Sequence, residues 1–379
     1  MKEIFPKTEC GVVHRTTESF FKMHGWPSVC ADDRGVLYAV CSGFRMEHAC
    51  PFGKNCMYLS FNGGKTWTPP IVVNDSYLDD RDTGIVYLGD GKMLLSFFSL
   101  GDKDDYRGFG DFDWMDEGRK AVILGMGKGV SLIDKKERQV GSYVKLSDDY
   151  GVTWSDRIRV PITAPHGPNV RKDGTLIYLG RADYTDNAED RAKVICYASL
   201  DGGHTWEKRG TVPPRDGLHT DFVHEPHVVE LPNGRLLGAL RVHCRPAPMT
   251  PTNTVYTTFS DDGGFTWSEP HCIGVNGLPP HLFVHSSGAV ICSYANRGDG
   301  TPDGGREERA AVSYDNGETW SEDYVLYANA LGDMGYPATA ELPDGSLITV
   351  YYQLYGKEDY LSSILYTKWK LGDPDGEEK

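Results

Sequence analysis

The chain has 379 residues and a formal net charge of -15 at pH 7. Such an acidic balance argues against a nucleic-acid or anionic-membrane partner, because both require a basic surface. Forty-four Gly, 22 Pro and 11% aromatic residues are typical of many short strands joined by tight turns, not of a helical protein.

The first ten residues, MKEIFPKTEC, lack the apolar segment of a signal peptide, and no stretch approaches the length of a membrane span. Nine cysteines without regular spacing fit reduced thiols, so we expect a soluble, cytoplasmic chain. Cys50 and Cys56 lie near His48, but no second Cys/His pair completes a metal site. We therefore expect no metal there.

Six pairs of short apolar strands follow one another along the chain, and a tight turn containing glycine joins each pair. The turns lie at 32–35, 89–91, 172–174, 232–234, 286–288 and 343–345. This repeat predicts an all-β fold, a six-bladed β-propeller in which each hairpin supplies the two inner strands of a blade. We expect residues 1–379 to form this one domain.

A second repeat, Ser-x-Asp-x-Gly-x-Thr-Trp, follows the first five hairpins, with Asn62 replacing Asp in the first copy. The copies lie at 60–67, 147–154, 199–206, 260–267 and 313–320. Asp can accept hydrogen bonds from turn amides, Gly supplies a positive φ, and Trp packs into the sheet, so we interpret all five as structural. The sixth hairpin leads to 362–369 without this motif, so the outer strand of its blade is expected from residues 11–15.

The second blade is longer than the others, with extra residues at about 101–138 that include a segment compatible with a short helix. An ordered surface excursion is one interpretation, and a substrate lid or oligomer contact is the other. The sequence does not define the oligomeric state.

The start of each inner strand and the end of the next strand lie on the same face of a propeller. Counting back from the turns gives as strand starts Trp26, Asp82, His166, Glu225, His281 and Tyr336. Counting forward gives as strand ends Arg45, about Leu100, Arg181, Arg241, Arg297 and Gln353. This gathering of titratable groups favours a functional face, and its arginines suit a carboxylate held in paired hydrogen bonds. We expect a carbohydrate ligand with a carboxylate.

The five motifs match the Asp box (BNR repeat) of the sialidase (neuraminidase) superfamily, and the resemblance covers nearly the whole chain. Residues 224–241 resemble the sialidase stretch in which a Glu begins one strand and an Arg ends the next, here Glu225 and Arg241. Residues 335–353 resemble the stretch with the nucleophilic tyrosine, here Tyr336. The resemblance implies that Glu225 acts as base toward Tyr336. A tyrosine packed in the pore with a glutamate capping its hydroxyl is the structural alternative.

The general acid is expected to be Asp82, with Asp79 and Asp80 as alternatives whose ordinary role is turn capping. This placement departs from the family, in which the acid comes from a loop of the first blade.

The arginines also depart from the family. The place of the sialidase Arg-Ile-Pro motif reads WPSV at 26–29, so one substrate-binding arginine is missing there, and Arg45 is a substitute from the same blade. For the third arginine, Arg306 and Arg309 compete; we prefer Arg309, with Arg297 nearby. Gln353 stands where sialidases usually place a Glu that orients an arginine.

Three functions remain open. The first is a retaining, exo-acting, sialidase-like glycosidase for a terminal acidic sugar, without metal or cofactor. The second is a glycosidase or lyase for a uronic acid or an arabinose oligomer, in which His166 or His281 supplies acid/base chemistry beside Asp82 and Glu225. The third is a non-catalytic sugar-binding propeller.

Overall fold

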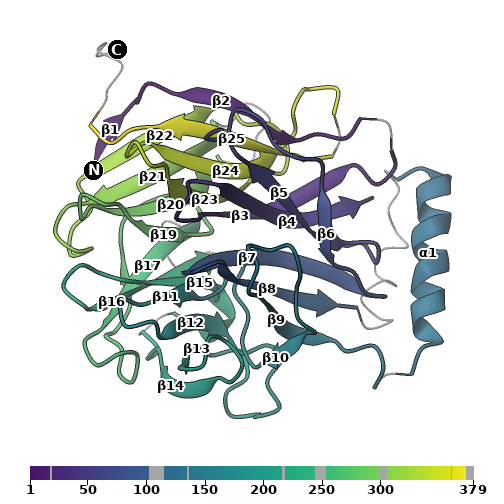
Figure 1. Ribbon diagram of the computed structural model, residues 1–379, viewed down its shortest axis with the longest axis horizontal. Helices are drawn as coiled ribbons and strands as arrows, with labels where there is room; N and C mark the ends of the chain where they lie inside the picture. The colour runs from purple at the N-terminus through teal and green to yellow at the C-terminus, as the bar shows by residue number, and fades with distance from the viewer. Residues whose placement is uncertain are drawn as a thin grey trace.

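The computed structural model describes residues 1–17, 19–101, 115–134, 136–215, 218–243, 253–298, 305–359 and 361–372. Six sheets surround a common axis, so the predicted six-bladed propeller is confirmed. The innermost strand of each sheet lies toward the middle of the molecule in Figure 1, and outermost strands such as β2 (Glu9–His14), β10 (Ile158–Val160) and β14 (Glu207–Thr211) lie at its periphery.

Each of the first three sheets has four strands in chain order from the axis outward. Blade one contains β3 (Met23–Ala31), β4 (Leu37–Arg45), β5 (Lys54–Ser60) and β6 (Ile71–Asn74). Blade two contains β7 (Asp79–Gly89), β8 (Lys92–Leu100), β9 (Gly141–Ser147) and β10 (Ile158–Val160). Blade three contains β11 (Asn169–Val170), β12 (Leu176–Arg181), β13 (Val194–Ser199) and β14 (Glu207–Thr211).

The other three sheets continue the ring. Blade four contains β15 (Val223–Glu230), β16 (Leu236–His243), β17 (Asn253–Ser260) and β18 (His271–Cys272), preceded by a 3-10 turn, η2 (Thr220–Phe222). Blade five contains β19 (His281–Val284), β20 (Val290–Asn296), β21 (Glu307–Ser313), β22 (Glu322–Ala328) and β1 (Lys2–Ile4). Blade six contains β23 (Gly335–Glu341), β24 (Leu347–Gln353), β25 (Ser363–Trp369) and β2 (Glu9–His14).

The N-terminal segment closes the ring as predicted, because β2 pairs antiparallel with β25. Its bounds are Glu9–His14, slightly earlier than the expected 11–15. The sequence analysis did not predict β1, which adds a fifth strand to blade five in parallel with β22. A parallel strand without a hairpin turn leaves no local turn signal in the sequence.

The Asp boxes are structural, as predicted. In the copy at 199–206, Asp201 Oδ1 accepts from the Thr205 amide at 2.9 Å and its Oδ2 accepts from the Thr205 hydroxyl at 2.7 Å. Trp206 Nε1 donates to the Gly203 carbonyl at 3.1 Å, and Gly203 has a φ of 102°. These bonds close the turn between the third and fourth strands of the blade, because β13 ends at residue 199 and β14 begins at residue 207.

The apolar core lies between neighbouring sheets rather than in one central mass. Blades one and six share one cluster, in which Leu37 and Tyr58 accompany Ile348 and Val350. Each blade is thereby packed against the next, and the ring holds the ends of its inner strands in fixed relative positions.

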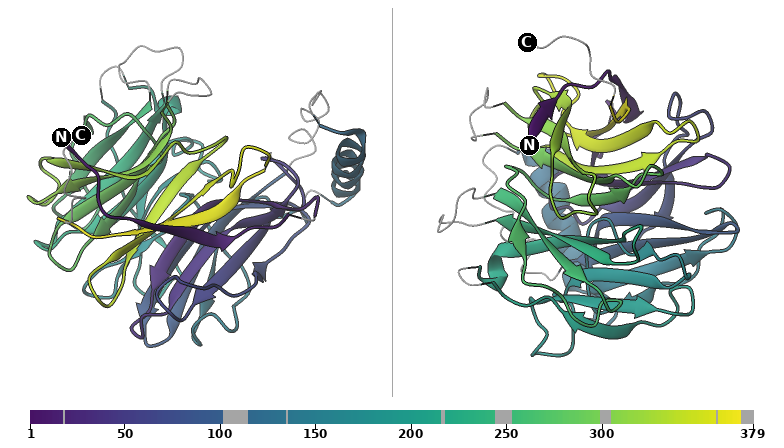
Figure 2. Two further views of the ribbon diagram at one scale, coloured as in Figure 1. Left: turned by 90° about the horizontal axis from the view of Figure 1, so that it is seen from above. Right: turned by 90° about the vertical axis from the view of Figure 1, so that its left-hand side faces the viewer.

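The long excursion of blade two contains a helix, α1 (Glu117–Ser131), which stands at the edge of the ring in Figures 1 and 2. Asp116 caps it by accepting from the Arg119 amide at 2.9 Å. Ile123 packs with Met46 and Cys50 from blade one. Residues 102–114 and 135 of the expected excursion lie outside the described residues. Among the helices that the structure describes, none is long and apolar enough to cross a membrane.

Candidate active site

Four of the six expected strand starts have the same unusual backbone conformation. The φ angles of Trp26, Asp82, Glu225 and Tyr336 are 55°, 46°, 41° and 54°. At each of them the register with the next strand is interrupted, as in a β-bulge. A left-handed non-glycine residue costs on the order of 1–3 kcal/mol, and such residues concentrate at functional sites. The bulges thus mark one end of the axis as the candidate site.

Tyr336, Glu225 and Arg241 form one hydrogen-bonded group. The Tyr336 hydroxyl donates to Glu225 Oε1 at 2.6 Å. Arg241 Nη1 donates to Glu225 Oε2 and lies 3.2 Å from the Tyr336 hydroxyl oxygen, to which it also donates. Blades four and six therefore contribute to a single constellation across the pore.

The electrostatics of this group fix its protonation. Burial raises the pKa of the Tyr336 phenol well above its ordinary value, and the Glu225 charge adds to this effect. Burial also opposes ionisation of Glu225, but Arg241 and the Tyr336 hydroxyl outweigh it, so the pKa of that carboxyl is lowered. At neutral pH a neutral phenol thus donates to a charged carboxylate that can accept its proton.

Asp82 has the opposite character. Burial raises the pKa of its carboxyl to about 7, Arg81 opposes the rise and Glu225 supports it. Asp82 Oδ1 has no hydrogen-bond partner among the described residues. Asp82 and Glu225 both border a cavity of about 130 Å³ whose wall also includes Arg181 and Tyr184. A carboxyl that is half protonated near pH 7 and faces a cavity has the properties of a general acid.

Comparisons with known proteins identify the family of the chain. Residues 116–349 match the sequence profile of the BNR repeat-like domain family. The chain belongs to this family. It is a BNR-repeat propeller of the sialidase superfamily.

Among curated proteins, the anhydrosialidase of Macrobdella decora is 26% identical over 265 residues, which are 62% of this chain and 33% of the relative. The aligned region thus spans a third of the relative's length. A protein of unknown function from Dyadobacter fermentans has a TM-score of 0.73 at 21% identity, covering 97% of this chain and 100% of that one. The Ruminococcus gnavus intramolecular trans-sialidase, solved with oseltamivir carboxylate, has a TM-score of 0.64 at 17% identity, covering 97% and 98%. Identities this low support the fold alone.

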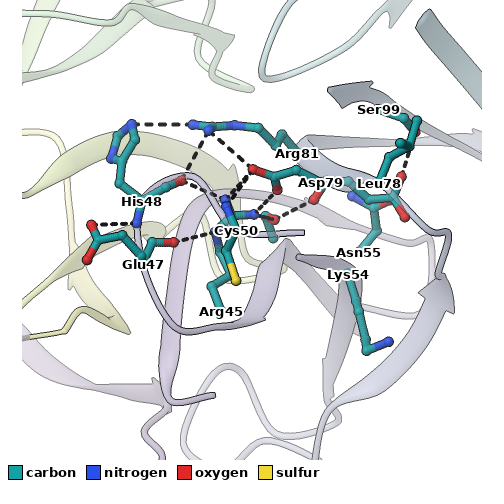
Figure 3. A network of polar contacts seen from close by, with 12 residues as sticks. Arg45, Glu47, His48, Cys50, Lys54, Asn55, Leu78, Asp79, Arg81 and Ser99 are labelled. Carbon is teal, nitrogen blue, oxygen red and sulfur yellow. Dashed lines mark hydrogen bonds and ion pairs between the residues drawn. The ribbon is translucent and has the colours of Figure 1, made fainter. Parts of the chain in front are cut away.

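Within this BNR-repeat propeller, Asp79 and Asp80 are structural, and Figure 3 shows Asp79 beside Arg45 and Cys50. Asp79 Oδ2 accepts from Arg45 Nη2 at 2.8 Å and from the Cys50 amide at 2.9 Å. Asp80 Oδ1 accepts from the hydroxyls of Ser76 and Ser99 at 3.0 and 2.5 Å. Both carboxylates anchor β7 to its neighbours, which leaves Asp82 as the candidate acid of this segment.

Arg45 does not replace the missing sialidase arginine, so that expectation is wrong. Its guanidinium is fully buried and donates to Asp79, to the Ser42 hydroxyl and to the backbone carbonyls of Glu47 and His48. All of its donors are thus used inside the fold, as Figure 3 shows for Asp79 and for the residue 47 and 48 carbonyls. Arg45 is a structural arginine that ties the blade-one loop to β7.

Arg297, rather than Arg309, lies at the site. A Cβ built on Gly335, the residue before Tyr336, would be 3.5 Å from Arg297 Nη2. Arg309 instead points to the outer strands, where it pairs with Glu3, Glu307 and Asp323 at 2.6, 2.6 and 2.8 Å. The preference for Arg309 is therefore wrong: in this sheet its side chain faces three carboxylates far out in the blade.

This difference gives a testable contrast between two arginines of one blade. We expect Arg297→Lys to raise KM about ten-fold with little change in kcat, because the planar fork for a carboxylate is lost. Arg309→Lys should leave both constants within about two-fold of wild type and lower the melting temperature, because partly exposed ion pairs are weakened. Steady-state kinetics and thermal unfolding of both variants would show it; a larger rise in KM for Arg309→Lys would contradict the assignment.

His166 and His281 lie deeper along the axis than expected. They form a cluster with His227, with ring centroids 4.8 Å apart for His166–His281 and 4.6 Å for His227–His281. All three border an axial cavity of about 270 Å³. Burial lowers the pKa of each ring, to about 3 for His227. We call the end of the pore that carries Asp82, Glu225 and Tyr336 the mouth. The neutral, buried histidine rings lie beneath it, with the His166 ring centroid 6.5 Å from that of Tyr336.

Gln353 ends β24 and is buried, and its Oε1 has no hydrogen-bond partner among the described residues. Sequence reasoning missed Arg81, His48 and Asp333, which lie around the mouth. None occupies a strand start or strand end, so counting from the turns could not find them. In the part of the chain that the structure describes, no group of three or more His, Cys, Asp or Glu residues is arranged to hold a metal ion.

Proposed function

We propose that this protein is an exo-acting, retaining glycoside hydrolase of the sialidase type that cleaves a terminal acidic sugar. The observation that carries the proposal is the contact of the Tyr336 hydroxyl with Glu225, with Arg241 bonded to both. A tyrosine that merely packs in the pore would not require two charged partners buried on its oxygen, since burying charge is costly.

In the first step Tyr336 attacks the anomeric carbon while Glu225 takes its proton. Asp82 gives its proton to the glycosidic oxygen as the bond to the leaving group breaks. Arg241 donates to the phenol oxygen and so stabilises the negative charge that develops there. In the second step Asp82 takes a proton from water, the water oxygen attacks the anomeric carbon, and Tyr336 leaves and regains its proton from Glu225.

A tyrosine nucleophile suits a particular substrate class. An ulosonic acid carries a carboxylate on its anomeric carbon, so a carboxylate nucleophile would be repelled, and a phenol approaches as a neutral group. Arg241 and Arg297 supply positive charge beside Tyr336 for this carboxylate. The relatives whose printed names describe sialidases or trans-sialidases support the same substrate class.

A panel of aryl glycosides tests the proposal. We expect release of the aryl group from the α-sialoside, and no release from its methyl ester, because the ester lacks the charge that Arg241 and Arg297 would bind. Aryl uronides and arabinosides serve as comparison substrates. Cleavage of these alone, or of the ester as fast as the acid, would contradict the assignment to an acidic sugar of this kind.

A further inference from the structure

The mouth between blades one and six differs from the sialidase pattern because residues 26–29 supply no arginine. His48 and Asp333 lie at this place. The His48 ring packs edge-on against Trp26, with ring centroids 4.9 Å apart. Asp333 Oδ2 is 3.5 Å from His48 Nδ1, and Asp333 Oδ1 is 3.8 Å from Arg297 Nη1. The Asp333 carboxylate thus lies between a histidine and the substrate-side arginine Arg297.

The polar network of Figure 3 holds His48 in position. Arg45 Nη2 donates to the His48 carbonyl at 2.6 Å and Arg81 Nη1 donates to the same oxygen at 3.1 Å. Arg81 Nη2 lies 3.4 Å from His48 Nε2. Arg45 is itself paired with buried Asp79, so the backbone of His48 is anchored to the interior of the fold.

The backbone around Asp333 is also held, but its side chain is accessible. Arg306 Nη1 donates to the Gly332 carbonyl at 2.6 Å, and the Leu354 amide donates to the Leu331 carbonyl at 3.1 Å. The Asp333 side chain is 47% exposed and borders a cavity of about 200 Å³. Rotation of this side chain would therefore free Arg297 without movement of the loop.

The surroundings keep Asp333 charged. Burial is the largest single influence and opposes its ionisation, but His48 and Arg297, with a smaller effect from the Tyr352 hydroxyl, together outweigh it, so the pKa of the carboxyl is lowered. Asp333 is therefore an anion at neutral pH, held beside the guanidinium that the proposed function assigns to the substrate.

We propose that Asp333 competes with the carboxylate of the substrate for Arg297 and thereby sets how tightly an acidic sugar binds. This inference rests on the proposed function. Two carboxylates beside one guanidinium repel each other, so binding of an acidic sugar has to displace the Asp333 side chain or share Arg297 with it. A ligand without the charge meets no such competition.

The test compares wild type with Asp333→Asn, using 2,3-unsaturated N-acetylneuraminic acid and its methyl ester as probes in titration calorimetry. Asn keeps the size of the side chain and removes the charge. We expect the variant to bind the acid about three- to ten-fold more tightly, as for a half-exposed ion pair, with unchanged affinity for the ester. KM for the aryl sialoside should fall by a similar factor, and kcat should stay within two-fold.

Asp173→Asn is the matched control, because the Asp173 side chain is 57% exposed and pairs with an arginine, Arg171, at 3.3 Å in the turn between β11 and β12, away from the site. It should leave acid binding unchanged. An equal gain in acid affinity in the control would show that the effect comes from the net charge of the protein, and would overturn the inference. Unchanged or weaker acid binding by Asp333→Asn would also overturn it. If neither wild type nor variant binds the acid while a neutral aryl glycoside is hydrolysed, the proposed function and the inference both fail.

Discussion

Tyr336→Phe is expected to lower kcat/KM on the aryl sialoside by roughly 10³-fold or more, as removal of a nucleophile does in other covalent mechanisms. The change deletes one hydroxyl, and Glu225 and Arg241 remain paired with each other. Stability should therefore stay close to wild type. Steady-state kinetics, with mass spectrometry of enzyme trapped by a fluorinated sialoside, would detect the loss of both turnover and covalent labelling.

Tyr352→Phe is the matched control for this result. The Tyr352 ring is also buried, 5.9 Å from Tyr336 between centroids, but Tyr352 forms no hydrogen bond to Glu225 in the described structure. Its kcat should change by less than about three-fold. Glu225→Gln should also lose activity, but it leaves Arg241 buried without a counter-ion and should cost about 3–5 kcal/mol of stability. Activity that survives Tyr336→Phe would exclude Tyr336 as the nucleophile.

Asp82→Asn is expected to abolish leaving-group protonation and to lower kcat/KM by about 10²- to 10⁴-fold on substrates with poor leaving groups. In the wild-type enzyme, kcat/KM should fall ten-fold per pH unit above about pH 7, because the Asp82 carboxyl loses its proton there. Asn tolerates a positive φ better than most residues, so the bulge should persist. A pH profile of the variant should lack this alkaline limb.

The same substitution should raise stability at alkaline pH. The folded pKa of Asp82, about 7, lies above the ordinary 3.8, so the stability that this group contributes below pH 4 is lost as the pH rises to 7. At roughly 1.4 kcal/mol per pH unit, Asp82→Asn should exceed wild type by several kcal/mol at pH 8 and match it near pH 4. Chemical unfolding at both pH values would measure this.

Asp80→Asn distinguishes a carboxyl that acts as general acid from one whose pKa is raised by burial in the fold alone. Burial raises the pKa of Asp80 to about 7 as well, but its carboxylate accepts from Ser99 and Ser76 inside the fold. The variant should therefore keep the alkaline limb of the pH profile. Loss of that limb in Asp80→Asn, or its persistence in Asp82→Asn, would show that Asp82 is not the acid.

The architecture could be predicted because its signals are local and repeated. Each turn glycine and each Asp box acts within a few residues, and the six hairpin turns define the number of blades. The same counting located Asp82, Glu225 and Tyr336, since in each of these blades the bulged residue lies 9 residues before the turn glycine, although the strand itself begins one to three residues earlier.

The arginines could not be assigned in this way, because the direction of a long side chain depends on contacts between blades. Arg45 ends β4 and Arg297 directly follows β20, so each lies at the end of the second strand of its blade. Arg45 nevertheless pairs with buried Asp79, whereas Arg297 lies beside Tyr336. Arg309 is drawn outward by carboxylates that include Glu3, more than 300 residues away in the sequence. The spacing of residues in the sequence does not reveal such partners.

The closure of blade six by β2 has a consequence for how the chain reaches this fold during synthesis. Residues 9–14 leave the ribosome long before their partner β25, residues 363–369. Until then the two ends cannot join, and β2 and β24 each expose an unpaired edge to other chains. Newly made, incomplete chains should therefore depend on chaperones more than the finished ring does.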